Sequence, residues 1–445
     1  MFENKKIFIL GMAKSGYEAA KLLSKYNNEI IVTDGKEQDP DHVKELEELG
    51  VKVIITTNQS DLLDESFDIM IKNPGVISTN ETVVKARNLG MKVINEIEMA
   101  YHFLPKNVKI VGITGSNGKT TTTTMIYEIL KRKYDNVYLG GNIGYPLAQI
   151  VNDIKDNSIL VMEISDHQLC DMYEFKTNIS LLLNLVHAHI DFHGTYEKYK
   201  EMKKRIFNNH TDKDIAILNI DNKDVLDLTQ DIVSKKIYFS DNKEVDAYIK
   251  DDAIYYKNDK VVDFKDIKLK GIHNYENIMA TILAVKQLDV EDSIIKEFLK
   301  TFGGVEHRIE FVETINGVDY YNDSKSTNNT ATITALKTFN TPTILIMGGL
   351  NRNIPFDELS EYMTNVKTII CYGETKDQIN EFASKNNIEC IVLDNLVDAT
   401  NKAHEIAASG DTVLLSPACA SWDQFKTFED RGNLYKETVN SFKGE

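Results

Sequence analysis

The run VKIVGITGSNGKTTTTTMIYEIL, from Val108 to Leu130, decides the fold of the chain's central part. Its first residues are apolar and typical of a buried strand, its middle contains glycines, and its end suits a helix. Glycines at such a turn let backbone N–H groups face phosphate oxygens, and the helix N-terminus adds positive potential. The run therefore predicts a phosphate-binding loop in an α/β domain, with Lys119 on the terminal phosphates and the Thr120 hydroxyl on Mg²⁺.

The predicted loop departs from the strict phosphate-loop pattern at one position. Ile113 stands where that pattern has its first glycine, and Gly112 lies one residue earlier. Strand, loop, Lys-Thr pair and helix nevertheless follow one another in the required order, which argues against a chance turn. We expect ATP as the ligand, bound by Gly115, Ser116, Asn117, Gly118, Lys119, Thr120 and Thr121.

Strand-like runs on both sides of this loop continue the α/β pattern. Near the N-terminus, a glycine-containing turn, an amphipathic helix and a second strand ending at Asp34 predict a Rossmann-like sheet. Taken alone, that turn is also compatible with a tight connection that binds no ligand. Nearly continuous apolar strands at 160–165, 179–185 and 215–219 indicate a parallel sheet covered on both faces, and short alternating strands in 236–271 predict an antiparallel addition to it.

A third α/β region follows Gly303-Gly304. The Asn316-Gly317 pair has the chemistry of a hairpin turn, and four apolar strands between residues 343 and 417 alternate with helices. The pattern also breaks at a proline near residue 105. We therefore expect three α/β domains: a Rossmann-like domain at 1–104, a P-loop ATPase-like parallel sheet at 105–304, and a Rossmann-like domain at 305–445.

The composition is that of a globular chain with an acidic surface. A hydrophobic share of 42% allows a large core, and the net charge of -17, with lysines scattered among carboxylates, argues against a nucleic-acid partner. No apolar run approaches the roughly 20 residues of a membrane span, and the start lacks the apolar core of a signal peptide, so a cytoplasmic chain is expected. The cysteines lack paired spacing, which predicts reduced, mostly buried thiols.

Further motifs follow the loop in an order that resembles the Mur ligase family. The loop matches that family's Thr-Gly-(Ser/Thr)-x-Gly-Lys-Thr, and residues 140–144 match its Gly-Gly-Asn-Ile-Gly. Residues 163–169 resemble its Glu-x-Ser-Ser-Phe-Gln-Leu, with Asp166 and His167 in place of Ser and Phe. The resemblance covers essentially the whole chain and implies an ATP-dependent amide-bond ligase of three domains.

The resemblance also implies Mg²⁺ ligands. Glu163 takes the place of one ligand, with Thr120 beside it, and His189 keeps another in the segment 184–194. That segment resembles Asn-x-x-x-Asp-His-x-Asp-x-His, with Ala188 where Asp is usual. By residue type alone it is also compatible with an exposed polar loop.

A second Mg²⁺ is implied by a lysine. Tyr199 to Lys203 match the family's Tyr-x-x-x-Lys, in which the lysine is carbamylated by CO₂. A carbamate is an anion that can ligate Mg²⁺, whereas an unmodified lysine cannot. Without the resemblance, Lys203 would be an ordinary helix lysine.

Two more motifs concern the nucleotide. Residues 271–277 resemble Gly-x-His-Asn-x-x-Asn, in which Asn274 and Asn277 contact adenine; alone, they would be a helix cap and a solvated amide. The third-domain motifs imply that Arg308 and Asp323 reach the ribose and phosphates and that Lys325 faces the reaction centre.

The C-terminal motif concerns the amino acid. Residues 416–425 closely resemble the Ser-Pro-Ala-Cys-Ala-Ser-x-Asp-x-Phe of D-glutamate-adding members. This implies that Thr327, Ser421 and the backbone near Phe428 bind D-glutamate. Arg352 stands where the family has a lysine for the side-chain carboxylate, which keeps the charge and changes the donor geometry.

The first domain is expected to bind a nucleotide sugar. Family positions imply uracil contacts near Lys14 and Lys36 and contacts to the sugar-diphosphate further along. The residues expected to bind this substrate are Ser15, Asp34, Asn73, Gly75 and Asn142.

Together the motifs imply that the chain uses ATP and two Mg²⁺ ions to join D-glutamate to UDP-N-acetylmuramoyl-L-alanine through an acyl phosphate. A monomer is expected, although no motif bears on the oligomeric state. We expect the third domain to close over the site because water would destroy that intermediate. The alternatives are an ATP-hydrolysing switch module, which explains the loop alone, and a folylpolyglutamate-type ligase. The latter is disfavoured by the complete N-terminal domain and the Ser-Pro-Ala-Cys segment.

Overall fold

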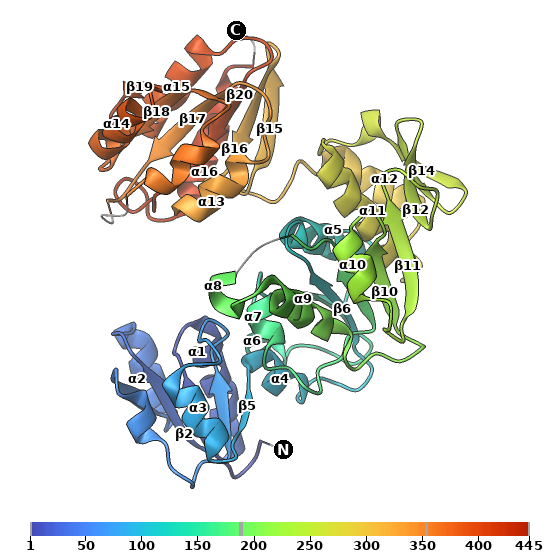
Figure 1. Cartoon of the computed structure of the whole chain (residues 1–445), viewed down its shortest axis with the longest axis vertical. Helices are drawn as coiled ribbons and strands as arrows, with labels where there is room; N and C mark the ends of the chain where they lie inside the picture. Colours follow the sequence, from blue (N-terminus) through green and yellow to red (C-terminus); the bar gives the residue numbers. More distant parts are fainter. Residues whose placement is uncertain (1, 187–189, 352–354, 444–445) are drawn as a thin grey trace. The chain divides into compact units, whose positions relative to one another are not determined.

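The computed structural model describes residues 2–186, 190–351 and 355–443 (Figure 1). The chain divides into two compact units, residues 1–300 and 301–445. Unit 1 contains two sheets and unit 2 contains one. The predicted α/β class with three parallel-dominated sheets is confirmed.

The first sheet of unit 1 is parallel throughout, in the order β3-β2-β1-β4-β5. Alternate residues of β1 face opposite sides, since Ile7 and Ile9 pack with α1 and α2, whereas Phe8 and Leu10 pack with α3. The elements are β1 (Lys6–Leu10), α1 (Lys14–Leu23), β2 (Glu29–Asp34), α2 (Pro40–Glu48), β3 (Lys52–Ile55), β4 (Ile69–Lys72), α3 (Glu81–Asn88) and β5 (Lys92–Ile94).

The second sheet has the order β14-β13-β12-β11-β10-β9-β6-β8-β7. Its strands β6 to β12 are parallel to one another, and the β12–β13 and β13–β14 pairs are antiparallel. The predicted antiparallel addition over 236–271 is therefore confirmed for β12 to β14 and wrong for β11, which has parallel neighbours on both sides. The strands are β6 (Lys109–Thr114), β7 (Val137–Gly141), β8 (Ile159–Glu163), β9 (Ile179–Leu182), β10 (Ile215–Asn219), β11 (Lys235–Ser240), β12 (Ala247–Lys250), β13 (Ala253–Tyr256) and β14 (Asp259–Asp263).

Helices around this sheet differ greatly in length. The long α5 and α11 pack beside the parallel strands, and short helices occupy the connections near the ends of β8 and β9 (Figure 1). The helices are α5 (Lys119–Lys131), α6 (Leu147–Ile150), α7 (Asp166–Leu169), α8 (Ile190–His193), α9 (Tyr196–Lys204), α10 (Lys223–Leu228), α11 (Ile272–Lys286) and α12 (Asp292–Thr301).

Helix α4 (Glu96–Tyr101) follows β5 and joins the two sheets of unit 1. One apolar cluster contains Ile9 of β1, Ile97 of α4 and Met162 of β8, so the two sheets share a core. Ion pairs reinforce this junction: Lys72 lies 3.0 Å from Asp171, and both side chains are almost fully enclosed.

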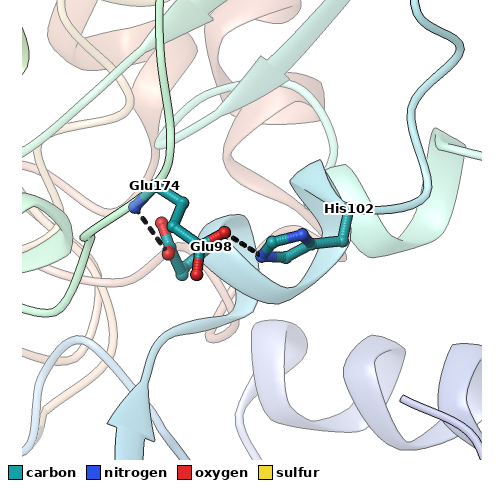
Figure 2. A group of neighbouring side chains, drawn as sticks. All are labelled: Glu98, His102 and Glu174. Carbon is teal, nitrogen blue, oxygen red and sulfur yellow. Dashed lines mark hydrogen bonds and ion pairs between the residues drawn. The ribbon is translucent and has the colours of Figure 1, made fainter. Parts of the chain in front are cut away.

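Figure 2 shows a second polar contact at the junction. The Glu98 carboxylate accepts the backbone N–H groups of Glu174 and Phe175 over 2.8 and 2.9 Å, and Glu174 lies 3.8 Å from His102 Nε2. Glu174 also accepts from Lys92 over 2.7 Å. Glu98, His102 and Glu174 are close enough to share a metal ion. Protein donors already bond both carboxylates, so no metal ion is needed to explain this cluster. The contact connects α4 to the loop after α7.

Unit 2 has the sheet order β15-β16-β20-β17-β18-β19, with only the β15–β16 pair antiparallel. In β17, Leu345 and Met347 face α13 and α14, whereas Ile344 and Ile346 face α15 and α16. The elements are β15 (Glu310–Ile315), β16 (Val318–Asn322), α13 (Asn329–Leu336), β17 (Thr343–Gly348), β18 (Val366–Tyr372), α14 (Lys376–Lys385), β19 (Glu389–Val392), α15 (Leu396–Ile406), β20 (Thr412–Leu415) and α16 (Phe428–Ser441).

The predicted hairpin turn is also confirmed. Asn316 and Gly317 adopt positive φ angles of 52° and 78° at the turn between β15 and β16, as a tight hairpin requires. The four cysteines form no disulfide, although Cys371 Sγ and Cys390 Sγ lie 3.5 Å apart on neighbouring strands. Among the helices that the structure describes, none combines the length and the apolar character needed to cross a membrane.

Candidate active site

The predicted phosphate loop lies between β6 and α5. Gly118 has φ of 80° at the N-terminus of α5, which leaves the backbone N–H groups of the first helical turn available to an anion. The loop is tied to the segment after β9, because Asn117 N donates to Asn184 Oδ1 over 2.8 Å and Ser116 N donates to Asn184 O over 2.9 Å. The chain therefore holds the loop in shape by hydrogen bonds of its own.

Lys119 curls back over this loop. Its Nζ donates to the carbonyl oxygens of Gly115 and Ser116, each over 2.9 Å. A lysine in this place presents its charge where loop-bound phosphates would lie. The geometry fits the predicted role of Lys119.

A buried carboxylate lies beside the loop. Glu163, at the end of β8, is 1% exposed and accepts hydrogen bonds from Thr120 Oγ1 over 2.8 Å and from Asn142 Nδ2 over 2.7 Å. Thr120 and Glu163 supply oxygen ligands of the kind that Mg²⁺ prefers. The donor set therefore fits a Mg²⁺ ion next to loop-bound phosphates.

Lys203 of α9 is buried in the same region. Its Nζ lies 3.1 Å from Asp166 Oδ1 and 3.3 Å from Thr114 Oγ1, and its side chain is fully enclosed. Burial, with the nearby charge of Lys119, lowers the pKa of Lys203 to about 8, against the opposing effect of Asp166. His189, the other predicted ligand here, lies outside the described residues.

The two predicted adenine residues differ in their surroundings. Asn277 of α11 is buried against the loop: its Oδ1 accepts from Thr122 Oγ1 over 3.3 Å, and a Cβ atom added at Gly118 would lie 2.1 Å from it. Asn274, one turn earlier, is half-buried and donates to Lys270 O over 2.8 Å. Only Asn277 touches the loop itself.

The residues predicted to bind the nucleotide sugar lie at the carboxyl edge of the first sheet. Asp34 Oδ2 accepts the backbone N–H of Met12 over 2.9 Å, while Asn73 donates to Ser15 Oγ over 3.1 Å and accepts from Gly75 N over 3.1 Å. Carboxyl ends of parallel strands are the usual ligand edge of such sheets.

This edge meets the loop that carries Asn142. Lys14 Nζ lies 3.4 Å from Gly144 O and 5.2 Å from the centre of the Tyr145 ring. Unit 1 thus brings the loop that carries Asn142 against Lys14 at this edge.

In unit 2, Asp323 lies just after β16 and is 1% exposed. It accepts from Ile309 N over 3.1 Å and from Ser416 Oγ over 2.7 Å, and burial raises its pKa to about 6. The neighbouring Arg308 is exposed, and the residues on either side of it, His307 and Ile309, have positive φ angles of 61° and 46°. Such a conformation is costly for a β-branched residue and is characteristic of functional segments.

The residues predicted to bind D-glutamate lie on separate loops of unit 2. Ser421 is buried, Thr327 and Phe428 are half-buried, and the exposed Lys325 has its Nζ 5.8 Å from the centre of the Phe428 ring. Arg352 lies outside the described residues.

Arg431 of α16 is a residue whose role sequence reasoning missed. Its side chain is fully buried and donates to Ser324 Oγ over 2.9 Å, to Ser324 O over 2.7 Å and to Cys419 O over 3.0 Å. It thereby ties together the loops that carry Lys325 and Ser421. Arg431 lies three residues after Phe428 in the sequence, but only the fold shows what it bonds.

A parallel sheet that presents a phosphate loop beside an enclosed carboxylate defines a phosphate-loop nucleotide-binding protein. Three family profiles match the chain in succession: the Mur ligase MurD-like N-terminal domain at residues 5–95, the Mur ligase middle domain at 113–285 and the Mur ligase glutamate ligase domain at 307–419.

Curated relatives match over the full length. UDP-N-acetylmuramoylalanine--D-glutamate ligase from Geobacillus kaustophilus (strain HTA426) is 42% identical over 447 residues, which cover 99% of each chain. The protein of the same name from Bacillus thuringiensis (strain Al Hakam) is 43% identical over 443 residues, which cover 99% of this chain and 98% of its own. This chain belongs to the Mur ligase family, whose members catalyse ATP-dependent ligation in peptidoglycan precursor synthesis.

Solved structures share the fold. The UDP-N-acetylmuramate-alanine ligase from Thermotoga maritima has a TM-score of 0.54 at 17% identity and covers 98% of this chain and 99% of its own. The MurF ligase of the same organism, solved in complex with ADP, has a TM-score of 0.53 at 18% identity, with coverages of 99% and 96%. The resemblance noted from the motifs is confirmed.

Proposed function

We propose that this chain joins D-glutamate to UDP-N-acetylmuramoyl-L-alanine in an ATP-dependent reaction that forms an amide, ADP and phosphate. The observation that carries the proposal is the match, at 42% identity over 99% of the chain, to relatives named for that ligation. The buried Glu163 beside the phosphate loop supports it independently, because phosphoryl transfer relies on a metal held next to the transferred group.

In the proposed mechanism, the loop residues 115–121 hold ATP with its γ-phosphate toward Glu163. The L-alanyl carboxylate of the nucleotide sugar attacks the γ-phosphorus in line, the bond to the ADP oxygen breaks, and an acyl phosphate results. Lys119 stabilises the negative charge on the transferring oxygens. The D-glutamate amine then attacks the acyl carbon, loses a proton, and expels phosphate as the amide forms.

Metal binding forms a second part of the proposal. Thr120, Glu163 and His189 would supply Mg²⁺ ligands, and Lys203 would hold a second Mg²⁺ once its amine has added to CO₂ and released a proton. Bound Mg²⁺ supplies charge neutralisation for the transferring phosphoryl group. Lys203 is fully enclosed, with its Nζ 3.1 Å from Asp166 Oδ1 and 3.3 Å from Thr114 Oγ1, and this enclosed position supports a role inside the site.

The three domains divide the remaining work. Residues 1–104 bind the nucleotide sugar through Ser15, Asp34, Asn73 and Gly75, with Asn142 added from the central domain. Residues 105–304 bind ATP, with Asn274 and Asn277 at adenine.

Residues 305–445 bind D-glutamate and complete the ATP site. Arg308 and Asp323 reach the nucleotide, Lys325 faces the reaction centre, and the amino-acid pocket is formed by Thr327, Arg352, Ser421 and Phe428. We propose that this domain closes over ATP to exclude water, that the enzyme is a monomer, and that it works in the cytoplasm. An unchanged scattering radius with all ligands bound would contradict closure.

Phosphate release tests the reaction. The purified chain receives ATP, Mg²⁺ and UDP-N-acetylmuramoyl-L-alanine, with D-glutamate, L-glutamate, D-alanine or no amino acid. We expect release that depends on D-glutamate, with the amide identified by its mass. Release indifferent to every amino acid would instead indicate an ATP-hydrolysing module.

A further inference from the structure

The strongest unassigned feature of unit 1 is the enclosed side chain of Asp166, one of the positions at which this chain departs from the family motif. Asp166 is 1% exposed and is the first residue of α7. The backbone there is fixed by a reciprocal cap, since Gln168 N donates to Ser165 Oγ over 3.3 Å and Ser165 N donates to Gln168 Oε1 over 2.9 Å. The carboxylate therefore projects from a well-defined position.

Each carboxylate oxygen of Asp166 contacts a different helix. Oδ1 lies 3.1 Å from Lys203 Nζ of α9, and Oδ2 lies 2.7 Å from His193 Nε2 of α8. The His193 side chain is only 4% exposed, so this contact is also enclosed. Enclosed charge pairs are specific in geometry, because a displaced partner would leave a charge without compensation.

We propose that Asp166 is a positioning residue that orients Lys203 and anchors α8 for the second metal site. The inference rests on the proposed carbamate of Lys203. A carbamylated lysine keeps one N–H, and the N–C–O₂ group is planar, like an amide. An acceptor fixed 3.1 Å from that nitrogen sets the direction of the N–H and thus the direction of the carbamate oxygens.

The second arm acts through α8. This helix has four residues, too few to be stable without tertiary contacts, and it begins at Ile190, immediately after His189. By holding His193 at the end of α8, Asp166 fixes the helix that directly follows His189 in the sequence. The serine usual at this position in the family has one short hydroxyl and could not contact both helices. In this chain the Asp166 carboxylate thus supports the metal site in a way that the family's usual serine could not.

The test uses the full-length chain and two readouts. In ¹³C-bicarbonate, ¹³C NMR reports the carbamate carbon, which Lys203→Ala identifies by removing its signal. A titration of ligase activity with Mg²⁺ gives the concentration for half-maximal rate. For Asp166→Asn we expect the carbamate signal to fall at least about fivefold and the half-activating Mg²⁺ concentration to rise at least about tenfold, as for lost outer-sphere support of a metal site. ADP binding to the loop should change less than twofold.

Asp171→Asn is the matched control. Asp171 is equally enclosed and ion-paired, lies five residues along the chain, and contacts Lys72 and Arg87 instead of the metal-site residues. Its variant should keep the wild-type carbamate signal and Mg²⁺ dependence.

His193→Asn separates the two arms of the proposal. It should keep the carbamate and raise the half-activating Mg²⁺ concentration. If Asp166→Asn fails to fold, Asp166→Ala, which removes the acceptor altogether, serves for the Lys203 arm. If the folded Asp166 variant keeps the carbamate signal of the wild type, the inference about Asp166 is wrong, while the proposed function is unaffected. A wild type without any Lys203-dependent signal would remove the carbamate from the proposed function and the inference with it, whereas D-glutamate-dependent ligation would still stand.

Discussion

Thr120 Oγ1 donates a hydrogen bond to Glu163 Oε2 over 2.8 Å, which joins the first turn of α5 to the end of β8. The neighbouring strands β6 and β8 are parallel, so both groups arise at the same edge of the sheet. This edge is where the phosphate loop presents its backbone N–H groups. The contact therefore places two oxygen ligands beside the phosphate site.

Replacing Glu163 tests this arrangement. Glu163→Gln preserves the shape of the side chain and removes its charge, so we expect ligase activity at low Mg²⁺ to fall about a hundredfold, since metal stabilisation of the transition state amounts to several kcal/mol. The measurement is amide formation against Mg²⁺ concentration. Glu174→Gln, a half-exposed glutamate of the same unit, is the control and should behave as wild type. Unchanged Mg²⁺ dependence in Glu163→Gln would remove Glu163 from the metal site.

The backbone of Gly118 supports a second prediction. Gly118→Ala should lower the free energy of unfolding by about 1–2 kcal/mol because its φ of 80° is left-handed. The new Cβ atom would also lie 2.1 Å from Asn277 Oδ1. Gly90 has a similar φ of 77° with open space around it, so Gly90→Ala should lose stability only through the unfavourable backbone conformation. We expect Gly118→Ala to lose more stability than Gly90→Ala, and only Gly118→Ala to lose ATP affinity, by tenfold or more. Calorimetric titration with ATP compares them, and equal affinities would contradict the role of the Gly118–Asn277 contact.

The sequence predicted the sheets well because buried parallel strands have a local signature. The strands at 109–114 and 159–163 are nearly continuous apolar runs. At the Asn316-Gly317 turn, the residue types themselves favour the positive φ angles that a tight hairpin needs. The phosphate loop was equally visible, since its strand, glycines and helix are contiguous. These features are determined by residues that are close together in the sequence, so the sequence alone is enough to predict them.

Contacts between distant elements could not be predicted in the same way. Lys72 ends a strand and would be expected in solvent, yet it is fully enclosed against Asp171, almost a hundred residues away. In the sequence, Asp166 is only a departure from a motif. Its contacts with two helices arise from tertiary packing, which the spacing of apolar residues does not reveal. Arg431 likewise gained a role only when the fold brought the carbonyl-bearing segments at Ser324 and Cys419 around it.

The buried carboxyl of Glu96 predicts a pH dependence of stability. Burial raises its pKa from 4.5 to about 7 in the folded chain. Between these values the unfolded chain releases the proton that the folded chain keeps, so the free energy of unfolding falls as pH rises from about 4.5 to 7 and then levels off. The shift corresponds to about 3 kcal/mol.

Glu96→Gln should remove that loss, because the amide oxygen still accepts from Ala148 N without ionising. We expect the variant to gain stability relative to wild type as pH rises, by up to about 3 kcal/mol. Urea unfolding of unit 1 from pH 5 to 8 measures the difference. Parallel pH profiles of the two proteins would show that Glu96 titrates normally.

Lys203 offers a chemical test of the carbamate. Lys203→Ala should lower activity about a hundredfold or more, and formate or acetate should restore part of it by supplying carboxylate oxygens in the vacated space. Lys204→Ala is the matched control, because Lys204 is the next residue, is part-exposed, and pairs with Asp231 over 2.8 Å. Amide formation with and without added carboxylate measures the rescue. Full activity of Lys203→Ala without any carboxylate would refute the assignment.

Arg431 holds the loops of unit 2 through buried hydrogen bonds. Arg431→Met leaves the carbonyls of Ser324 and Cys419 without their buried donor, at about 1–3 kcal/mol each, so we expect unit 2 to lose several kcal/mol of stability. Because these loops also carry Lys325 and Ser421, KM for D-glutamate should rise about tenfold even at temperatures where the variant is folded. ATP affinity, which depends mainly on the loop of unit 1, should change less than KM for D-glutamate.

Lys436→Met on the same helix separates packing from positioning. Lys436 is mostly covered but pairs with Glu306 and Glu310 near the surface, over 2.6 and 3.3 Å, and such pairs contribute about 1 kcal/mol or less. Its loss should leave KM for D-glutamate unchanged. Arg431→Lys keeps the charge but not the planar set of donors, so its KM should lie between wild type and Arg431→Met. Steady-state kinetics with D-glutamate as the varied substrate distinguish these outcomes, and equal KM values for all three variants would show that Arg431 stabilises the unit without positioning the substrate loops.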